Sequence, residues 1–97
     1  MKNLNKDNFN EFVRAGDCLV QFSAEWCGPC KVLTRIIEST QDLAVPVGKI
    51  DIDSATTLVS KFGIKSVPTL ILFRNGKESE RAVGGKAFDV IKPHLNE

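Results

Sequence analysis

Short apolar segments alternate with amphipathic segments along most of this chain, and this alternation restricts its possible folds more than any other feature. Apolar segments bounded by turn residues predict strands at Cys18–Ser23, Val45–Ile52 and Thr69–Phe73. Apolar residues at spacings of three and four predict helices between and around them. Strands that alternate with helices favour parallel pairing through right-handed crossovers.

The predicted helices have recognisable ends. We expect Asp7 to cap the first helix and Ser54 to cap the third, because short polar side chains accept hydrogen bonds from the first amides of a helix. The second helix should run from Lys31 to about Ser39. The last should span Ala87 to Leu95, with Pro93 kinking it or ending it early.

The second half of the chain adds an antiparallel edge to the sheet. Asn75-Gly76 is a strong hairpin signal, and Lys77–Val83 follows it as a returning strand. A further short strand is expected near Leu4. The predicted fold is therefore α/β, with a central mixed sheet of four to five strands and helices on both faces. A length of 97 residues suits one domain over residues 1–97.

Composition excludes several classes of function. The chain has 13 Lys and Arg against 12 Asp and Glu, so its formal charge of +1 gives no electrostatic argument for nucleic acid or membrane partners. No run approaches the roughly 20 apolar residues of a membrane span, and no apolar segment resembling a secretory signal follows the N-terminus. We therefore expect a cytoplasmic protein, and nothing suggests an obligate oligomer, so we expect a monomer.

The segment Trp26-Cys27-Gly28-Pro29-Cys30 joins a predicted strand to a predicted helix. Unpaired amides and the dipole at a helix start favour an anion, so the pKa of the Cys27 thiol should be depressed. Cys30 follows one turn later, close enough to form a disulfide. The pair predicts thiol–disulfide exchange, in which Cys27 attacks a substrate disulfide and Cys30 then displaces the substrate.

A metal site is the alternative interpretation of this cysteine pair. Zinc needs four ligands, and Cys18 and His94 are the other candidates for a Cys/His set. The odd count of three cysteines also argues against a secreted disulfide scaffold. We predict redox chemistry without a metal, and we expect Cys18 to be a buried apolar residue.

The chain resembles the thioredoxin family over nearly its whole length. The matching segments, in order, are Ala24–Lys31, Lys49–Asp53, Phe62–Ile64, Val67–Thr69, Phe73–Gly76 and Val83–Gly85. The resemblance implies a thioredoxin fold and the activity of a protein-disulfide reductase. It also implies a Trp-Cys-Gly-Pro-Cys redox centre at Trp26–Cys30.

Roles for other residues follow from the same resemblance. Pro68 matches the family's cis-proline beside the active cysteines, and Val67 matches the residue whose backbone pairs with an extended substrate. The implied substrate surface comprises Trp26, Gly28, Pro29, Val67, Pro68, Gly84 and Gly85. The implied partners are disulfide-containing proteins and an NADPH-dependent thioredoxin reductase. NADPH and FAD belong to that reductase, and we expect no cofactor bound to this chain, which lacks a G-x-G-x-x-G segment.

Gln21 departs from the family pattern, because it occupies the place of a buried aspartate credited with proton transfer at the second cysteine. A glutamine amide forms hydrogen bonds but does not titrate. Lys49 matches the lysine that pairs with that aspartate. It can turn toward Asp51 or solvent, or it can accept the Cys30 proton with a pKa lowered by burial. We include both residues among the catalytic candidates and expect slower resolution of the mixed disulfide near neutral pH.

Other functions stay open at this point. An oxidase or isomerase would use the same cysteines, although Gly-Pro between them resembles the reducing branch of the superfamily. An interaction module could clamp a protein partner with the same surface, with redox activity incidental. Asp51 and Asp53, two residues apart, are expected to form a polar face of a strand.

Overall fold

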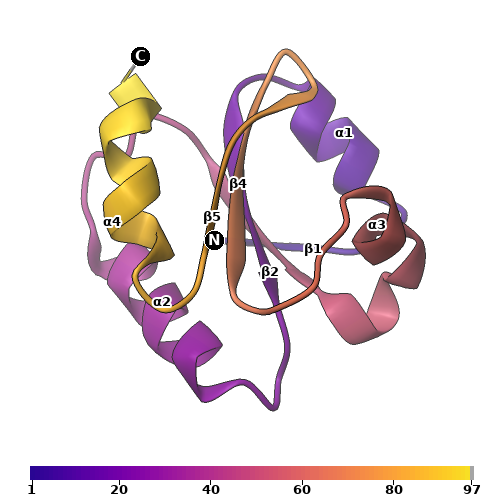
Figure 1. The fold of residues 1–97 in the computed structure, drawn as a ribbon. Coiled ribbons are helices and arrows are strands. Elements are labelled where there is room, and N and C mark those ends of the chain that lie inside the picture. The colour runs from indigo at the N-terminus through magenta and orange to yellow at the C-terminus, as the bar shows by residue number, and fades with distance from the viewer. Residues whose placement is uncertain (97) are drawn as a thin grey trace.

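A five-stranded mixed sheet lies between two layers of helices in the computed structural model, which describes residues 1–96 (Figure 1). The strands are β1 (Lys2–Leu4), β2 (Cys18–Ser23), β3 (Val47–Asp51), β4 (Thr69–Arg74) and β5 (Lys77–Val83), in the order β1-β3-β2-β4-β5. Strands β1, β3 and β2 are parallel, whereas β4 runs antiparallel to both β2 and β5. The predicted fold class and the short first strand are confirmed.

The helices divide between the two faces of the sheet. Helices α1 (Phe9–Arg14) and α3 (Thr56–Lys61) cover one face, and α2 (Gly28–Ser39) and α4 (Ala87–Ile91) cover the other (Figure 1). Short 3₁₀ helices follow β3 at Ile52–Ser54 and α4 at Lys92–Asn96. As expected, the last helix loses its α-helical form just before Pro93.

Strand β2 separates the two cores because all six of its residues are buried. Cys18, Val20 and Phe22 pack in the core with α1 and α3, whereas Leu19 packs in the core with α2 and α4. Side chains alternate along a strand, so Gln21 shares the face of Leu19. This alternation places one polar side chain of the strand beneath helix α2.

The expected caps at Asp7 and Ser54 were wrong. Asn8 precedes α1 without a side-chain cap, and the Asn5 Oδ1 atom accepts the backbone N–H groups of Asp7 and Asn8. Helix α3 follows Ala55, because Ser54 already belongs to the 3₁₀ helix.

The expected strand over residues 45–52 was also too long. Strand β3 covers Val47–Asp51, and the chain then turns into the 3₁₀ helix at Ile52. The Asp51 Oδ1 atom accepts the Asp53 N–H at 2.8 Å, which stabilises this turn.

Candidate active site

The two cysteines lie where β2 ends and α2 begins. Cys27 is the N-cap residue of α2, and Pro29 occupies its first turn, where the missing N–H leaves no helix bond unmade. The Cys27 Sγ atom accepts the backbone N–H of Cys30 at 3.2 Å. This confirms the predicted place of Cys27 at a helix N-terminus, where the backbone favours a negative charge on sulfur.

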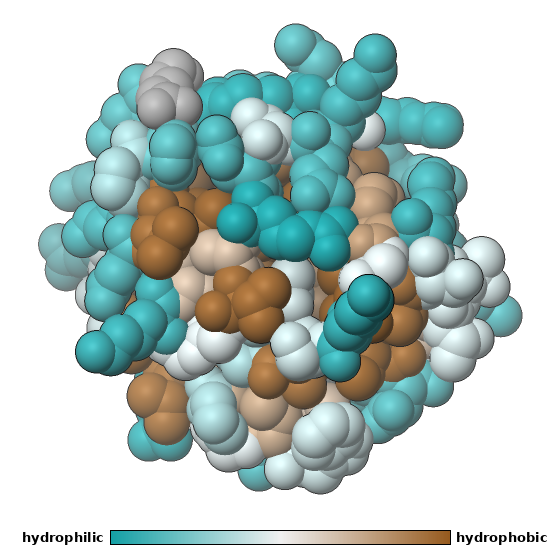
Figure 2. All heavy atoms as spheres, viewed as in Figure 1, coloured by the Kyte–Doolittle hydropathy of each residue, from teal (hydrophilic) through white to brown (hydrophobic). Residues whose placement is uncertain are grey.

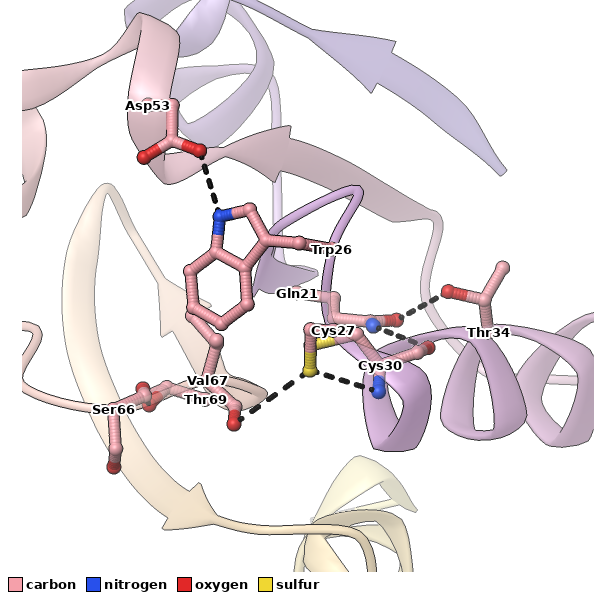
Figure 3. Close-up of a disulfide and its surroundings, with 9 residues drawn as sticks. All are labelled: Gln21, Trp26, Cys27, Cys30, Thr34, Asp53, Ser66, Val67 and Thr69. Atoms are coloured by element: carbon pink, nitrogen blue, oxygen red, sulfur yellow. Dashed lines mark hydrogen bonds between the residues drawn. A yellow bond between two sulfur atoms is a disulfide. The ribbon is translucent and has the colours of Figure 1, made fainter.

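A disulfide joins Cys27 and Cys30, with their Cα atoms 5.3 Å apart (Figure 3). Both residues are nearly buried, with Cys27 5% exposed and Cys30 1% exposed. The backbone carbonyl oxygen of Val67 lies 3.9 Å from Cys27 Sγ. Cys27 is thus the less buried cysteine of the pair and lies against the segment before β4.

Trp26 stands beside the disulfide with 69% of its surface exposed. Its indole Nε1 donates a hydrogen bond of 2.9 Å to Asp53 Oδ2, which orients the ring (Figure 3). This contact was not predicted, and the expected polar strand face of Asp51 and Asp53 was wrong, because Asp53 lies in the 3₁₀ helix after β3. No local pattern announces the contact, because the two residues are 27 positions apart.

Val67, whose carbonyl oxygen lies beside Cys27 Sγ, belongs to a segment that reaches Gly84. The Val67-Pro68 peptide bond is cis, as the resemblance implied, and the Pro68 carbonyl accepts the Gly84 N–H at 2.9 Å. That hydrogen bond connects the segment before β4 with Gly84-Gly85 after β5. Gly84 has a φ of 102°, a conformation that favours glycine.

Apolar side chains collect near the centre of the molecular face seen in Figure 2, with hydrophilic ones around them. Large exposed apolar residues include Trp26, next to the disulfide, and Val83, which precedes Gly84. Trp26 therefore leaves exposed aromatic surface next to the disulfide.

Gln21 is fully buried beneath the first turns of α2. Its side-chain Nε2 donates to the Cys30 carbonyl oxygen at 3.1 Å, and its Oε1 accepts the Thr34 hydroxyl at 3.2 Å. Gln21 is therefore tied to the backbone of Cys30 in the structure, whereas a family-type aspartate would carry a titratable group here. Thr34 was not among the residues predicted for the site.

Lys49 lies next to Gln21 in the sheet, because the two residues are register partners on β3 and β2. It lines a cavity of about 750 Å³ whose wall also includes Thr34, Arg35 and Asp51. Lys49 forms no ion pair within 4.0 Å in residues 1–96, so it does not pair with Asp51. Its half-buried side chain is available to the cavity.

Cys18 is separate from this site. It is 0% exposed in the core on the other face of β2, as predicted for a buried apolar residue. Burial, and secondarily the Asp17 carboxylate, raises the pKa of the Cys18 thiol to about 11.

No three His, Cys, Asp or Glu side chains in residues 1–96 are grouped as metal ligands, and none of the described helices has the length and apolar character to cross a bilayer.

The raised pKa of Cys18 predicts a loss of stability at high pH. The neutral thiol is favoured by folding, so its contribution is complete below pH 9.0 and is lost as the pH rises through about 11. The free energy of unfolding of the oxidised protein should fall by about 2–3 kcal/mol over this interval. Denaturant titrations of wild type and Cys18→Ala isolate this term, since the lysine contributions cancel. Equal pH slopes in the two proteins would contradict it.

Comparisons with known proteins agree with this geometry. The thioredoxin family model matches residues 1–97. A thioredoxin from Chlamydia caviae is 42% identical over 99 residues, covering 100% of this chain and 97% of that protein. A thioredoxin from Chlamydia muridarum is 48% identical over 90 residues, covering 91% and 88%.

Solved structures show the same likeness. Thioredoxin f2 of Chlamydomonas reinhardtii superimposes with a TM-score of 0.85 at 26% identity, covering 100% of this chain and 98% of that one. A thioredoxin of Plasmodium falciparum gives 0.87 at 25% identity, covering 99% and 97%. The family match covers the whole chain and so spans the segment that holds the Cys27–Cys30 pair. The chain therefore belongs to the thioredoxin family and is a thiol–disulfide oxidoreductase of the protein-disulfide reductase type.

Proposed function

We propose that this chain reduces protein disulfides with Cys27 as the nucleophile and Cys30 as the resolving thiol. The observation that carries the assignment is the placement of the two sulfurs. Cys27 Sγ lies at the N-terminus of α2 and accepts the Cys30 N–H, whereas Cys30 is almost fully buried behind it. Amides directed at Cys27 stabilise a thiolate, which is the reactive form of cysteine.

The reaction consists of two balanced exchanges. The Cys27 thiolate attacks one sulfur of a substrate disulfide, and the other substrate sulfur leaves as a thiolate and takes up a proton. Cys30 then loses its proton and attacks Cys27 Sγ, which forms the Cys27–Cys30 disulfide and releases the second substrate thiolate. Two electrons pass from the protein to its substrate.

The proposed docking surface surrounds the more exposed sulfur. An extended substrate would pair with the backbone of Val67 by strand addition, close to Cys27. The surface comprises Trp26, Gly28, Pro29, Val67, Pro68, Gly84 and Gly85. The Trp26–Asp53 and Gly84–Pro68 hydrogen bonds support this assignment, because they preorganise both sides of the surface before a substrate arrives.

Two further residues act on the resolving step in this proposal. Gln21 holds the Cys30 backbone, and Lys49 would receive the proton that Cys30 releases whenever its amine is neutral. The cavity supports the role of Lys49, because it is also lined by Thr34, which donates to Gln21 beside the Cys30 backbone. An ion pair of Lys49 with Asp51 is not observed in residues 1–96, and in this proposal the Lys49 amine faces the cavity.

The proposed partners are disulfide-containing proteins and a thioredoxin reductase. That reductase would pass electrons from NADPH through FAD to the Cys27–Cys30 disulfide, and this chain would carry them onward. We place this electron transport in the cytoplasm, where it would maintain cell redox homeostasis, and expect a monomer whose single domain spans residues 1–97. The bacterial thioredoxins that resemble the chain support this setting.

Reduction of an insulin-type disulfide substrate with thioredoxin reductase and NADPH tests the proposal. We expect catalytic consumption of NADPH by wild type and none by Cys27→Ser/Cys30→Ser, because no thiolate remains at the head of α2. The reduction potential of the Cys27–Cys30 couple provides a second measurement, since it distinguishes a reductant from an oxidant. A wild-type protein without turnover would contradict the reductase assignment and favour an interaction module.

A further inference from the structure

The side chain of Gln21 has one orientation that satisfies its neighbours. The Cys30 carbonyl oxygen only accepts hydrogen bonds, so the amide nitrogen of Gln21 must face it, as the 3.1 Å contact shows. Gln21 Oε1 then faces Thr34, whose hydroxyl donates at 3.2 Å. Without that donor, a fully buried carbonyl oxygen would lose the hydrogen bond described for it.

The Thr34 hydroxyl donates to a side chain of β2 and not to its own helix. A threonine within a helix often donates to the carbonyl four positions earlier, which here belongs to Cys30. The structure instead directs the hydroxyl to Gln21 and leaves the Cys30 carbonyl to the Gln21 amide (Figure 3). Helix α2 and strand β2 are thereby joined through one glutamine.

The same connection reaches both sulfurs. Thr34 donates to Gln21, Gln21 donates to the Cys30 carbonyl, and the Cys30 N–H donates to Cys27 Sγ at 3.2 Å. The backbone of Cys30 is thus held on both its carbonyl and its amide side. In the oxidised protein the disulfide also fixes this geometry, but in the mixed disulfide only non-covalent contacts hold Cys30 in place.

We propose that Thr34 is a positioning residue for the resolving step, acting through Gln21 on the backbone of Cys30. This inference rests on the proposed reductase function and adds a residue to its machinery. Attack within one protein is fast when the reacting atoms are held close and aligned. An uncharged glutamine–threonine pair holds them at every pH, because neither side chain titrates.

Thr34→Val tests the inference, since valine keeps the shape of threonine and removes the hydroxyl. In single-turnover reduction of a protein disulfide, we expect the resolving rate to fall about two- to tenfold, which is the range for one net hydrogen bond. The first attack by Cys27 should change less, because Cys27 remains the N-cap residue of α2. Alkylation of the reduced proteins at several pH values should show a higher pKa for the Cys27 thiol in Thr34→Val than in wild type.

Thr34→Ser is the matched control, because it restores the hydroxyl but lacks the methyl group. It should return both the resolving rate and the Cys27 titration toward wild type. Equal resolution and titration in Thr34→Val and wild type would overturn the inference, and so would a serine variant as slow as the valine variant. The titration needs no substrate turnover, so loss of the reductase function would be seen separately as an inactive wild type.

Discussion

Replacing Cys30 by serine is expected to stop turnover and leave the protein covalently joined to its substrate. Cys27 keeps its place as the N-cap residue of α2 and still attacks a disulfide. The serine hydroxyl cannot displace the substrate sulfur, so the mixed disulfide accumulates. Catalytic reduction should fall by about 10³-fold or more, because only external thiols at low concentration can replace the attack within the protein.

Intact-mass measurement of the reaction mixture checks this expectation. A one-to-one adduct with the substrate should appear and should disappear when a small dithiol is added. Cys27→Ser is the matched control, and it should form no adduct, because Cys30 is only 1% exposed. Adducts on Cys30, or normal turnover by Cys30→Ser, would reverse the assigned roles of the two sulfurs.

Features encoded locally were predicted well from the sequence. The hairpin between β4 and β5 is an example, because Asn75 and Gly76 both adopt left-handed backbone conformations, with φ of 56° and 77°. The place of Cys27 at the head of a helix was predicted, but α2 begins at Gly28, before the expected Lys31. Such features depend on backbone preferences and residue spacing, which one sequence contains.

Features that depend on competing or distant partners were not predictable. The cap at Asp7 was wrong because Asn5 provides the local hydrogen bonds and no spacing rule ranks these two residues. The contact between Trp26 and Asp53 joins residues 27 positions apart, and that between Gln21 and Thr34 joins residues 13 apart. Both contacts need the folded arrangement of β2, α2 and the segment after β3. The reactive cysteines could therefore be predicted from the sequence, but the hydrogen bonds that position the residues around them could not.

Gln21→Asp is expected to make the protein less stable. The shorter carboxylate loses the hydrogen bond to the Cys30 carbonyl and places a charge at a position that is 0% exposed. We expect a loss of about 3 kcal/mol in the free energy of unfolding at pH 7. Burial raises the pKa of the introduced carboxyl above its unfolded value, so the loss should be smallest at low pH and should grow as the pH rises through the folded pKa. Gln21→Asn is the matched control, because asparagine has the shape of aspartate but no charge. Its loss of stability should show no such pH dependence.

The same variant should resolve its mixed disulfide faster, although it is less stable. An ionised carboxylate beneath α2 can take the Cys30 proton, so the resolving rate at pH 7 should rise by about tenfold or more and follow the ionisation of the new group. Lys49→Met should slow resolution severalfold in the wild-type background but barely in Gln21→Asp, where the carboxylate takes over its task. Single-turnover rates from pH 6 to 9 measure both effects. An unchanged resolving rate in Gln21→Asp over this range would show that the amide does not limit the reaction. If Lys49→Met had no effect in wild type, the proton of Cys30 would have to leave by another route, such as the departing substrate thiolate.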